Sequence, residues 1–351
     1  MIKIIDKIDL LDGIKLDWED MVAKSSNTTP FQSYAYVRAS CESMNMEKQS
    51  LFIMLYFSIK ENKLQAIFPL YIDHSHTLRF INDIHTDFCD AIILDSVKGD
   101  YHLWEEIVMS IFQRTDIKSI CLRNLRSSSA INAYFKYFFR PSLEYADNAY
   151  SMLSINPCVS GEHFSNCLCF LTGRERQKLR QISKKITDLG FRVFDCMTDD
   201  SRKILDDLIC KMLELGIREN KYIQEILPIV YDMWRSRLAS VFVTYKNDMP
   251  VALKVFLHNK NSKEYISWLM FYTDKKCNQY NIIQSLEHIS KVGGIYNFAR
   301  GVYGYKMEKF RPQIHNLYTF RWSRSIWGQL GDLCAMNLYH VKQIVKKIIR
   351  K

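Results

Sequence analysis

The sequence predicts a mixed α/β protein made of two similar halves, each a central mixed sheet flanked by helices. Its 351 residues are about twice the usual domain length of roughly 100 to 200 residues. Both halves show the order hairpin, strand, helix, strand, with hairpins expected at 50–73 and 240–258. Asn156-Pro157 breaks an extended segment, so we expect domains spanning 1–155 and 156–351.

The first half begins with helical patterns and continues as strands separated by polar loops. Serine and proline residues between positions 25 and 30 fit a loop that feeds a helix, and Glu61-Asn62 is a connection short enough for a hairpin. The expected elements are, in order, a helix near Trp18–Ala23, a helix over 33–43, strands over 50–60, 65–73 and 78–81, a polar loop over 82–90, a strand over 91–95, a helix over 101–114 and a strand over 118–125.

The second half repeats this order after a basic helix, and its hairpin turns at Asn247-Asp248. The last part of this half is rich in tyrosine and lysine and bends at Arg300-Gly301, so it is expected to hold a ligand. The expected elements are a helix over 174–189, a strand over 191–195, helices between 199 and 239, the hairpin, a strand over 264–274, a helix over 278–292, a strand over 295–298 and a final strand over 317–321.

The amino-terminal segment has no apolar centre of the kind that an export signal needs, because Asp6, Asp9 and Asp12 interrupt it. The longest uncharged apolar run, 50–59, is about half of the ~18 residues needed to cross a bilayer. We therefore expect a cytoplasmic protein.

The ten cysteines are scattered, and the close pair Cys167 and Cys169 has no second pair or histidine set at zinc-site spacing. We expect reduced cysteines in the core and no metal. The net charge of +10 indicates polyanionic partners, which include nucleic acid, a membrane surface and phosphorylated small molecules.

Five segments carry a resemblance to a known family: Thr29–Ala39, Leu64–Ile72, His85–Asp90, Arg174–Lys185 and Pro250–Phe310. In these segments the chain resembles the tandem-domain branch of the GNAT acyltransferase superfamily, which includes polysaccharide-cluster acetyltransferases and nucleotide-sugar N-acyltransferases. The resemblance implies two tandem GNAT-like domains, the second of which binds acyl-coenzyme A.

The chain departs from the family's pattern at two places. Asn297 stands where the family usually has an aspartate, and Ile282-Ile283 where it often has proline-glycine, which leaves Asn278 to Asn281 to begin the helix. No carboxylate can therefore act from position 297.

The resemblance implies a donor site in the second half, with acyl-coenzyme A as co-substrate. The strand at 267–271 is expected to splay away from the strand at 295–298, freeing backbone groups for the pantetheine arm and an N–H for the oxyanion. There are two structural alternatives: 267–271 is an ordinary buried strand, and the basic residues of 174–185 form only the exposed face of a helix. The candidate donor contacts are Trp268, Leu269 and Met270 on the strand, Gln279, Tyr280 and Asn281 at the helix start for the diphosphate, and Arg174, Arg176, Lys178 and Arg180 for the nucleotide phosphates.

An acceptor amine must lose a proton to attack a thioester, so a carboxylate or imidazole should lie within reach. The loop over 82–90 supplies such groups, although its residues are also common turn formers. A duplicated fold is expected to place its ligands where its halves join. The candidates are His85 or Asp83 as base, Tyr305 to protonate the leaving thiolate or to orient the acyl group, Gln32, Asn82, Asp87 and Asp90 as acceptor contacts, and Arg300, Tyr303 and Lys306 as further substrate contacts.

The resemblance implies an acyl-coenzyme A dependent N-acyltransferase that acts on a nucleotide-linked amino sugar for surface polysaccharide, without nucleic acid as a partner. One alternative is a peptidyltransferase like the cell-wall cross-bridge enzymes, which use aminoacyl-tRNA. Another is a non-catalytic component of a glycan-assembly complex at a membrane surface. For the latter, apolar and basic residues alternate over 339–351 as in a basic amphipathic helix, which would allow peripheral membrane contact.

Overall fold

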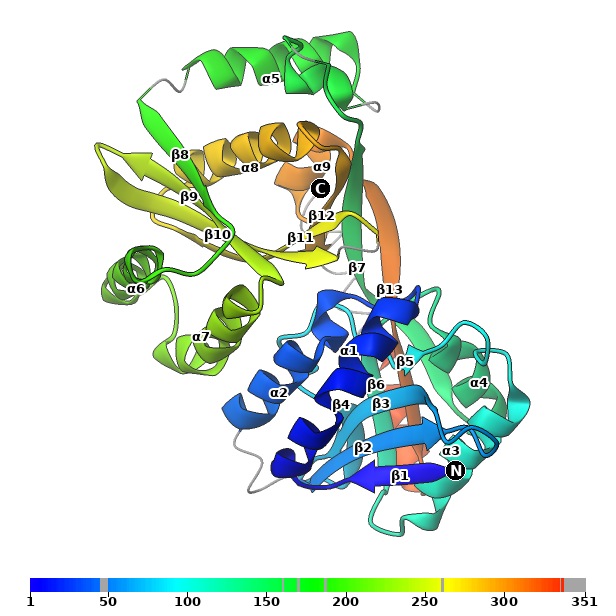
Figure 1. Ribbon diagram of the computed structural model, residues 1–351. Helices are drawn as coiled ribbons and strands as arrows, with labels where there is room; N and C mark the ends of the chain where they lie inside the picture. Colours follow the sequence, from blue (N-terminus) through cyan, green and yellow to red (C-terminus); the bar gives the residue numbers. More distant parts are fainter. Residues whose placement is uncertain are drawn as a thin grey trace. The chain divides into compact units, whose positions relative to one another are not determined.

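The computed structural model describes residues 1–44, 50–159, 161–168, 171–185, 188–259, 262–334 and 336–337, without the side chains of 183–185, 305, 306 and 308. The chain forms two compact units (Figure 1). Unit 1 contains residues 1–149 and the chain from Asn316 on, and unit 2 contains Tyr150–His315.

Unit 1 has a mixed sheet in the order β1-β2-β3-β4-β6-β13. The β4–β6 pair is parallel, and the other neighbours are antiparallel. The elements are β1 (Ile2–Ile5), η1 (Ile8–Ile14), α1 (Lys15–Lys24), η2 (Pro30–Gln32), α2 (Tyr34–Ser43), β2 (Ser50–Phe57), β3 (Leu64–Ile72), β4 (Thr77–Phe80), β5 (Ile92–Ile93), α3 (Tyr101–Gln113), β6 (Ser119–Arg126), α4 (Ala130–Phe138) and β7 (Leu143–Ile155).

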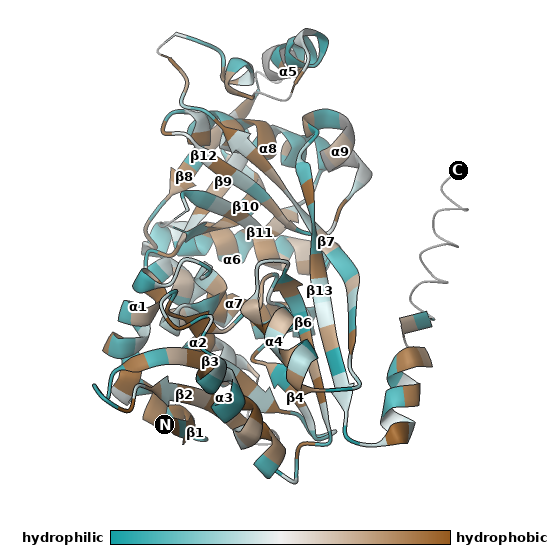
Figure 2. Cartoon of the chain, turned by 90° about the vertical axis from the view of Figure 1, so that its right-hand side faces the viewer, coloured by the Kyte–Doolittle hydropathy of each residue, from teal (hydrophilic) through white to brown (hydrophobic). Residues whose placement is uncertain are grey.

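The core of unit 1 follows from hydrophobic periodicity. In α3, Asp100 caps the first turn by accepting from His102 N, and apolar residues from Leu103 to Ile111 recur on one buried face. That face packs against β2 and β3, whose central residues are buried on both sides of the sheet. These strands are largely hydrophobic in Figure 2, whereas α5 of unit 2 is largely hydrophilic.

Unit 2 has the sheet order β7-β12-β11-β10-β9-β8, in which the β11–β12 pair is parallel. Helix α8 covers one face of this sheet, and α6 and α7 cover the other (Figure 1). The remaining elements, in chain order, are η4 (Phe164–Cys167), α5 (Gly173–Lys185), β8 (Leu189–Phe194), α6 (Asp199–Glu214), α7 (Asn220–Arg235), β9 (Ala239–Lys246), β10 (Met249–Asn259), β11 (Glu264–Tyr272), α8 (Lys275–Ser290), β12 (Gly294–Arg300), α9 (Gly304–Phe310) and β13 (Gln313–Ser323), the last of which joins the sheet of unit 1.

The two halves of the chain are built from the same succession of elements, which confirms the predicted duplication and fold class. Apart from the short β5 and the 3-10 helices, a strand, two helices, a hairpin, a strand, a helix, a strand, a helix and a strand follow one another from β1 to β7. From β8 to β13 the order is the same. In each half the helix after the hairpin connects a parallel strand pair, β4–β6 or β11–β12.

The last strand of each half pairs with the other half's sheet, and this exchange was not predicted. Strand β13 pairs with β6, and β7 pairs with β12 through residues 150–155. The chain from Asn316 on therefore groups with the first unit instead of the second. The sequence patterning could not reveal this, because it marks strands without naming their partners.

Two further expectations differ from the structure, and one helix, α9, was not predicted. Helix α8 begins at Lys275 instead of near Asn278, because Asp274 accepts hydrogen bonds from the first N–H groups and caps it there. Residues 304–310 form helix α9. Cys158 and Cys167 form a disulfide, since the turn at η4 brings them together, so not every cysteine is reduced as expected.

In the described part of the chain, no helix is long and apolar enough to cross a membrane. The basic segment 339–351 lies outside the described residues.

Candidate functional site

The parallel strands of unit 2 part after a short stretch of pairing. In the described chain, β11 and β12 pair through Glu264–Ile295, Tyr265–Tyr296 and Ile266–Asn297, whereas β11 continues to Tyr272 along β10. Among the described residues, the β11–β12 ladder has no further pair beyond Ile266. A strand edge that its neighbour leaves can pair with an amide-bearing ligand between the strands.

A β-bulge lies on β11 at the start of this opening. Val255 of β10 is opposite Leu269 and Phe256 is opposite Ser267, so Trp268 is an extra residue. Bulges reorient the local backbone and are common beside active sites. Of the three residues predicted for this strand, Trp268 and Leu269 have buried side chains, and the carbonyl of Met270 accepts a hydrogen bond from Arg218 Nη2 at 3.3 Å.

Asn297 holds the two strands together where their pairing ends. Its Nδ2 donates to Glu264 Oε1 at 2.5 Å, and its Oδ1 accepts from Ala299 N at 2.8 Å. Both Asn297 and Glu264 are buried. An aspartate at position 297 would face the Glu264 carboxylate, and two buried like charges repel. This contact explains why an amide fits where the family has a carboxylate.

A cavity of about 570 Å³ lies at the amino-terminal end of α8. Lys246, Lys276 and Lys309 line it together with Asp188 and Asp274. Three ammonium groups around one cavity favour phosphate groups. Sequence reasoning missed these lysines, because they come from three elements far apart in the chain.

The first turn of α8 already has an anion of its own. Asp274 Oδ1 accepts from Lys276 N at 2.5 Å and from Cys277 N at 3.3 Å. A bound diphosphate would have to compete with this carboxylate for the helix N–H groups. Any phosphate held here is therefore better matched by the lysine side chains than by the helix end.

Two of the three residues predicted at the start of α8 bond within the protein. Tyr280 OH donates to Leu189 O at 3.0 Å, and Asn281 Nδ2 donates to Phe242 O at 2.8 Å. Gln279, in contrast, lines the cavity at the α8 start.

The basic residues of α5 lie mainly on its exposed side. Leu179 is buried, whereas Arg174 and Lys178 are exposed and Arg176 is half-buried. Arg180 bonds locally, donating to Ser165 Oγ at 3.2 Å and to Asn166 Oδ1 at 2.5 Å.

In unit 1 the corresponding opening between parallel strands is filled by the chain itself. Strands β4 and β5 both pair with β3, and the segment 81–91 between them turns toward β6. Asn124 of β6 donates from Nδ2 to Asp83 O at 3.1 Å and to Thr86 O at 2.8 Å. Cys89 N donates to Asn124 O at 3.1 Å and forms a parallel bridge with Leu125. We call residues 81–91 the plug.

The acceptor candidates from 82 to 90 all belong to this plug. Asn82 donates to Ser40 Oγ at 3.2 Å, and Asp83 accepts from Arg79 Nη1 at 3.3 Å. Asp87 is also buried, and His85 is half-buried, so His85 is the most accessible of the predicted polar residues in the loop.

Asp90 is a buried carboxyl group at the end of the plug. Its Oδ1 accepts from Ser129 Oγ at 2.8 Å and from Ala91 N at 2.9 Å. Burial is the main influence and raises the pKa of Asp90 to about 6, although these hydrogen bonds favour the ionised form.

Gln32 is buried and connects η2 to the plug. Its Nε2 donates to Phe88 O at 2.7 Å, and its Oε1 accepts from Thr29 N at 2.9 Å as part of a capping box.

The bend after β12 has the backbone that its sequence predicts. Gly301 has a φ of +94°, and a Cβ there would lie 2.8 Å from the Tyr303 ring, so glycine suits this position. Tyr303 is exposed and Arg300 is half-buried. The side chains of Tyr305 and Lys306 lie outside the described residues, although their backbone belongs to α9.

Within the described residues, no group of three or more His, Cys, Asp or Glu side chains could hold a metal ion.

No protein-family model matches the sequence, and no curated protein matches it significantly. Solved structures do match. A C-terminal domain (DUF2156) assigned to a lysylphosphatidylglycerol synthetase of Agrobacterium fabrum has a TM-score of 0.60 and 12% identity, covering 93% of this chain and 96% of that one.

Two other solved structures resemble the chain over most of its length. L-PGS of Bacillus licheniformis has a TM-score of 0.56 and 10% identity, covering 90% of this chain and 94% of that one. FemX has a TM-score of 0.56 and 9% identity, covering 88% and 96%. At these identities the similarity concerns the fold alone.

Proposed function

We propose that this protein is an acyltransferase whose donor binds in unit 2, and specifically an acyl-coenzyme A dependent N-acyltransferase. The observation that carries the proposal is the parting of β11 and β12 beyond Ile266, next to the bulge at Trp268. The two amides of a pantetheine arm can bond to the strand edge that β12 leaves. The thioester then lies beside the bulge.

The backbone N–H of Leu269 or Met270 is the proposed oxyanion donor. A donor of this kind contributes about 3 to 4 kcal/mol to transition-state stabilisation in enzymes where one has been removed. The phosphates of the donor are proposed to bind Lys246, Lys276 and Lys309. Gln279 lines the same cavity, and the exposed Arg174 and Lys178 of α5 are further candidates for the nucleotide phosphates.

The acceptor is proposed to be the amino group of a nucleotide-linked amino sugar used for surface polysaccharide. The amine nitrogen attacks the thioester carbonyl, the C–S bond breaks, and the amine gives up one proton while the thiolate gains one. His85 is the proposed base because it is the most accessible titratable group of the plug. Tyr305 is the proposed acid, and Arg300, Tyr303 and Lys306 are proposed substrate contacts. The net charge of +10 suits two polyanionic substrates.

A second candidate donor is aminoacyl-tRNA. The specific observation in its favour is the Asp274 carboxylate at the α8 amino terminus, which occupies N–H groups that a diphosphate would use. The structures similar to this chain include FemX and L-PGS. Aminoacyl-tRNA is also the donor of the cell-wall cross-bridge enzymes, which are the alternative given in the sequence analysis.

Binding measurements separate the two donors. We expect calorimetry to show saturable binding of coenzyme A, weakened about tenfold by the double variant Lys246→Gln, Lys276→Gln. Lys263→Gln, which removes a lysine outside this cavity, is the matched control and should bind as the wild type does. Binding of charged tRNA with steep salt dependence, together with no binding of coenzyme A, would select the second candidate.

A further inference from the structure

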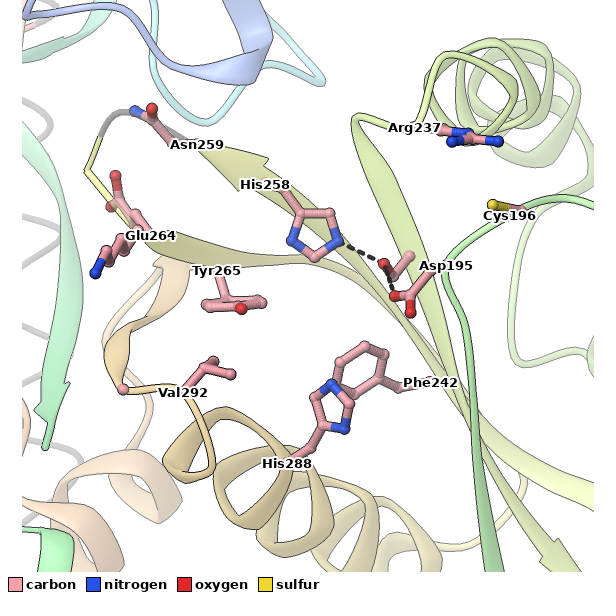
Figure 3. Close-up of a pocket in the computed structure, with 13 residues that line it drawn as sticks. Asp195, Cys196, Arg237, Phe242, His258, Asn259, Glu264, Tyr265, His288 and Val292 are labelled. Atoms are coloured by element: carbon pink, nitrogen blue, oxygen red, sulfur yellow. Dashed lines mark hydrogen bonds between the residues drawn. The ribbon is translucent and has the colours of Figure 1, made fainter. Parts of the chain in front are cut away.

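Unit 2 contains a second cavity, of about 600 Å³, at the other end of α8 (Figure 3). It reaches β11 at Glu264 and Tyr265, before the strands part, α8 at His288, and the turn after α8 at Val292. The lysine-lined cavity lies instead at the start of α8. The side chains that surround the space in Figure 3 are Asp195, Phe242, His258, Tyr265, His288 and Val292.

A hydrogen-bonded chain holds Asp195 at the wall of this cavity. Ser240 Oγ lies 2.7 Å from Asp195 Oδ1 and 2.5 Å from His258 Nε2. An ionised carboxylate can only accept, so the single hydroxyl proton of Ser240 is donated to Asp195. His258 must then carry a proton on Nε2 and donate it to Ser240.

This proton order decides what the chain can do. In a nucleophilic triad the serine gives its proton to the histidine, whereas here the serine gives it to the aspartate. Ser240 is also only 1% exposed, so no substrate can reach it for attack. The chain therefore orients the Asp195 carboxylate, which is itself exposed, toward the cavity.

His288 adds no positive charge to the cavity near neutral pH. Burial lowers the pKa of His288, an effect that the Asp195 charge only partly offsets, so His288 is neutral there. The ring of His288 packs edge-on against Phe242 at 5.1 Å, and that of His258 against Tyr265 at 5.1 Å. Aromatic faces attract cations, and they stand here beside a carboxylate. The basic Arg237 and Lys263 are exposed at the edge of the space.

We propose that this cavity binds a small organic cation, with its ammonium group on Asp195 and its body against the side chains of Tyr265 and His288. The volume suits a compact ligand, since small-molecule sites measure about 300 to 1,000 Å³. This site is separate from the proposed donor site, and its test does not depend on acyl transfer.

The test compares two sugars that differ in one group. D-glucosamine carries an ammonium group and D-glucose carries a hydroxyl at the same position. Calorimetry near neutral pH should show saturable binding of glucosamine and at least tenfold weaker binding of glucose. The ¹H–¹³C signals of the His258 and His288 rings should shift with glucosamine, which locates the ligand.

The decisive variant is Asp195→Asn, which retains an acceptor for Ser240 and removes the charge. It should weaken glucosamine binding at least tenfold, and Asp248→Asn, an exposed turn residue, should leave it unchanged. Histidine signals of unchanged dispersion would show that the variant is folded. Equal binding of the two sugars, full binding by the Asp195 variant, stationary histidine signals or no saturable binding by the wild type would each overturn the proposal.

Discussion

Asp90 offers a quantitative test of the plug, because its burial has an electrostatic cost that one substitution removes. Burial raises its pKa from 3.8 to about 6. The folded state therefore binds the Asp90 proton more tightly than the unfolded chain does. The stabilising contribution of this proton is present below about pH 3.8 and is lost as the pH rises through about 6.

The magnitude follows from the two pKa values. One pKa unit corresponds to about 1.4 kcal/mol, so ionised Asp90 costs about 3 kcal/mol of unfolding free energy at pH well above 6. At about pH 4.5 the same linkage gives a cost of about 1 kcal/mol. Asp90→Asn removes the ionisation and retains an oxygen that can accept from Ser129 and Ala91.

The expected result is a difference between two pH values. The unfolding free energy of Asp90→Asn, relative to wild type, should be about 2 kcal/mol more favourable at about pH 7.5 than at about pH 4.5. Taking this difference cancels any constant effect of packing the amide. Urea unfolding followed by circular dichroism measures it, and Asp95→Asn, an exposed residue near the plug, is the matched control. A pH-independent effect of Asp90→Asn would refute the assignment of a buried, raised-pKa carboxyl group.

Three further predictions concern the proposed sites. Asp274→Asn keeps an acceptor for Lys276 N and removes a negative charge beside the lysine-lined cavity. Calorimetry should therefore show that coenzyme A binds several-fold more tightly. Unchanged or weaker binding would mean that the phosphates bind elsewhere. His85→Ala and Lys306→Ala should each lower turnover in a coupled thiol-release assay while leaving the melting temperature within a few degrees, and unchanged kinetics in both would remove these assignments. The pKa of His288 is lowered in the folded state, so its contribution to stability is present above about pH 6.5 and is lost as the pH falls through the folded pKa. His288→Phe should therefore flatten the acid side of a plot of melting temperature against pH. A plot parallel to that of the wild type would contradict this.

Local patterns in the sequence were sufficient to predict most elements and the order of both halves. At the Asn247-Asp248 turn, both residues have a positive φ, as a tight hairpin requires. Asn62 has a positive φ in the equivalent turn of unit 1. Turn chemistry and alternating hydrophobicity are local properties, so one sequence is enough to identify them.

Features that depend on partners distant in the sequence were missed. The pairing of β13 with β6 and of β7 with β12 needs knowledge of three-dimensional neighbours, which alternation along a strand does not contain. The lysines at the α8 start and the group around Asp195 each come from several elements. No spacing rule connects such residues, so only the fold could bring them together.

The plug explains how two halves with the same order of elements can have different roles. In both, a parallel strand pair is joined by one helix, and the geometry leaves an opening where the strands part. In unit 1 the strand opposite β3 is interrupted, and the inserted residues bond to Asn124 and Leu125 of β6. In unit 2 the corresponding strand, β11, runs unbroken from Glu264 to Tyr272 and leads directly to α8. The inserted segment of unit 1 thus pairs with β6 where β11 and β12 part in unit 2, which is the reason for proposing the donor site in unit 2.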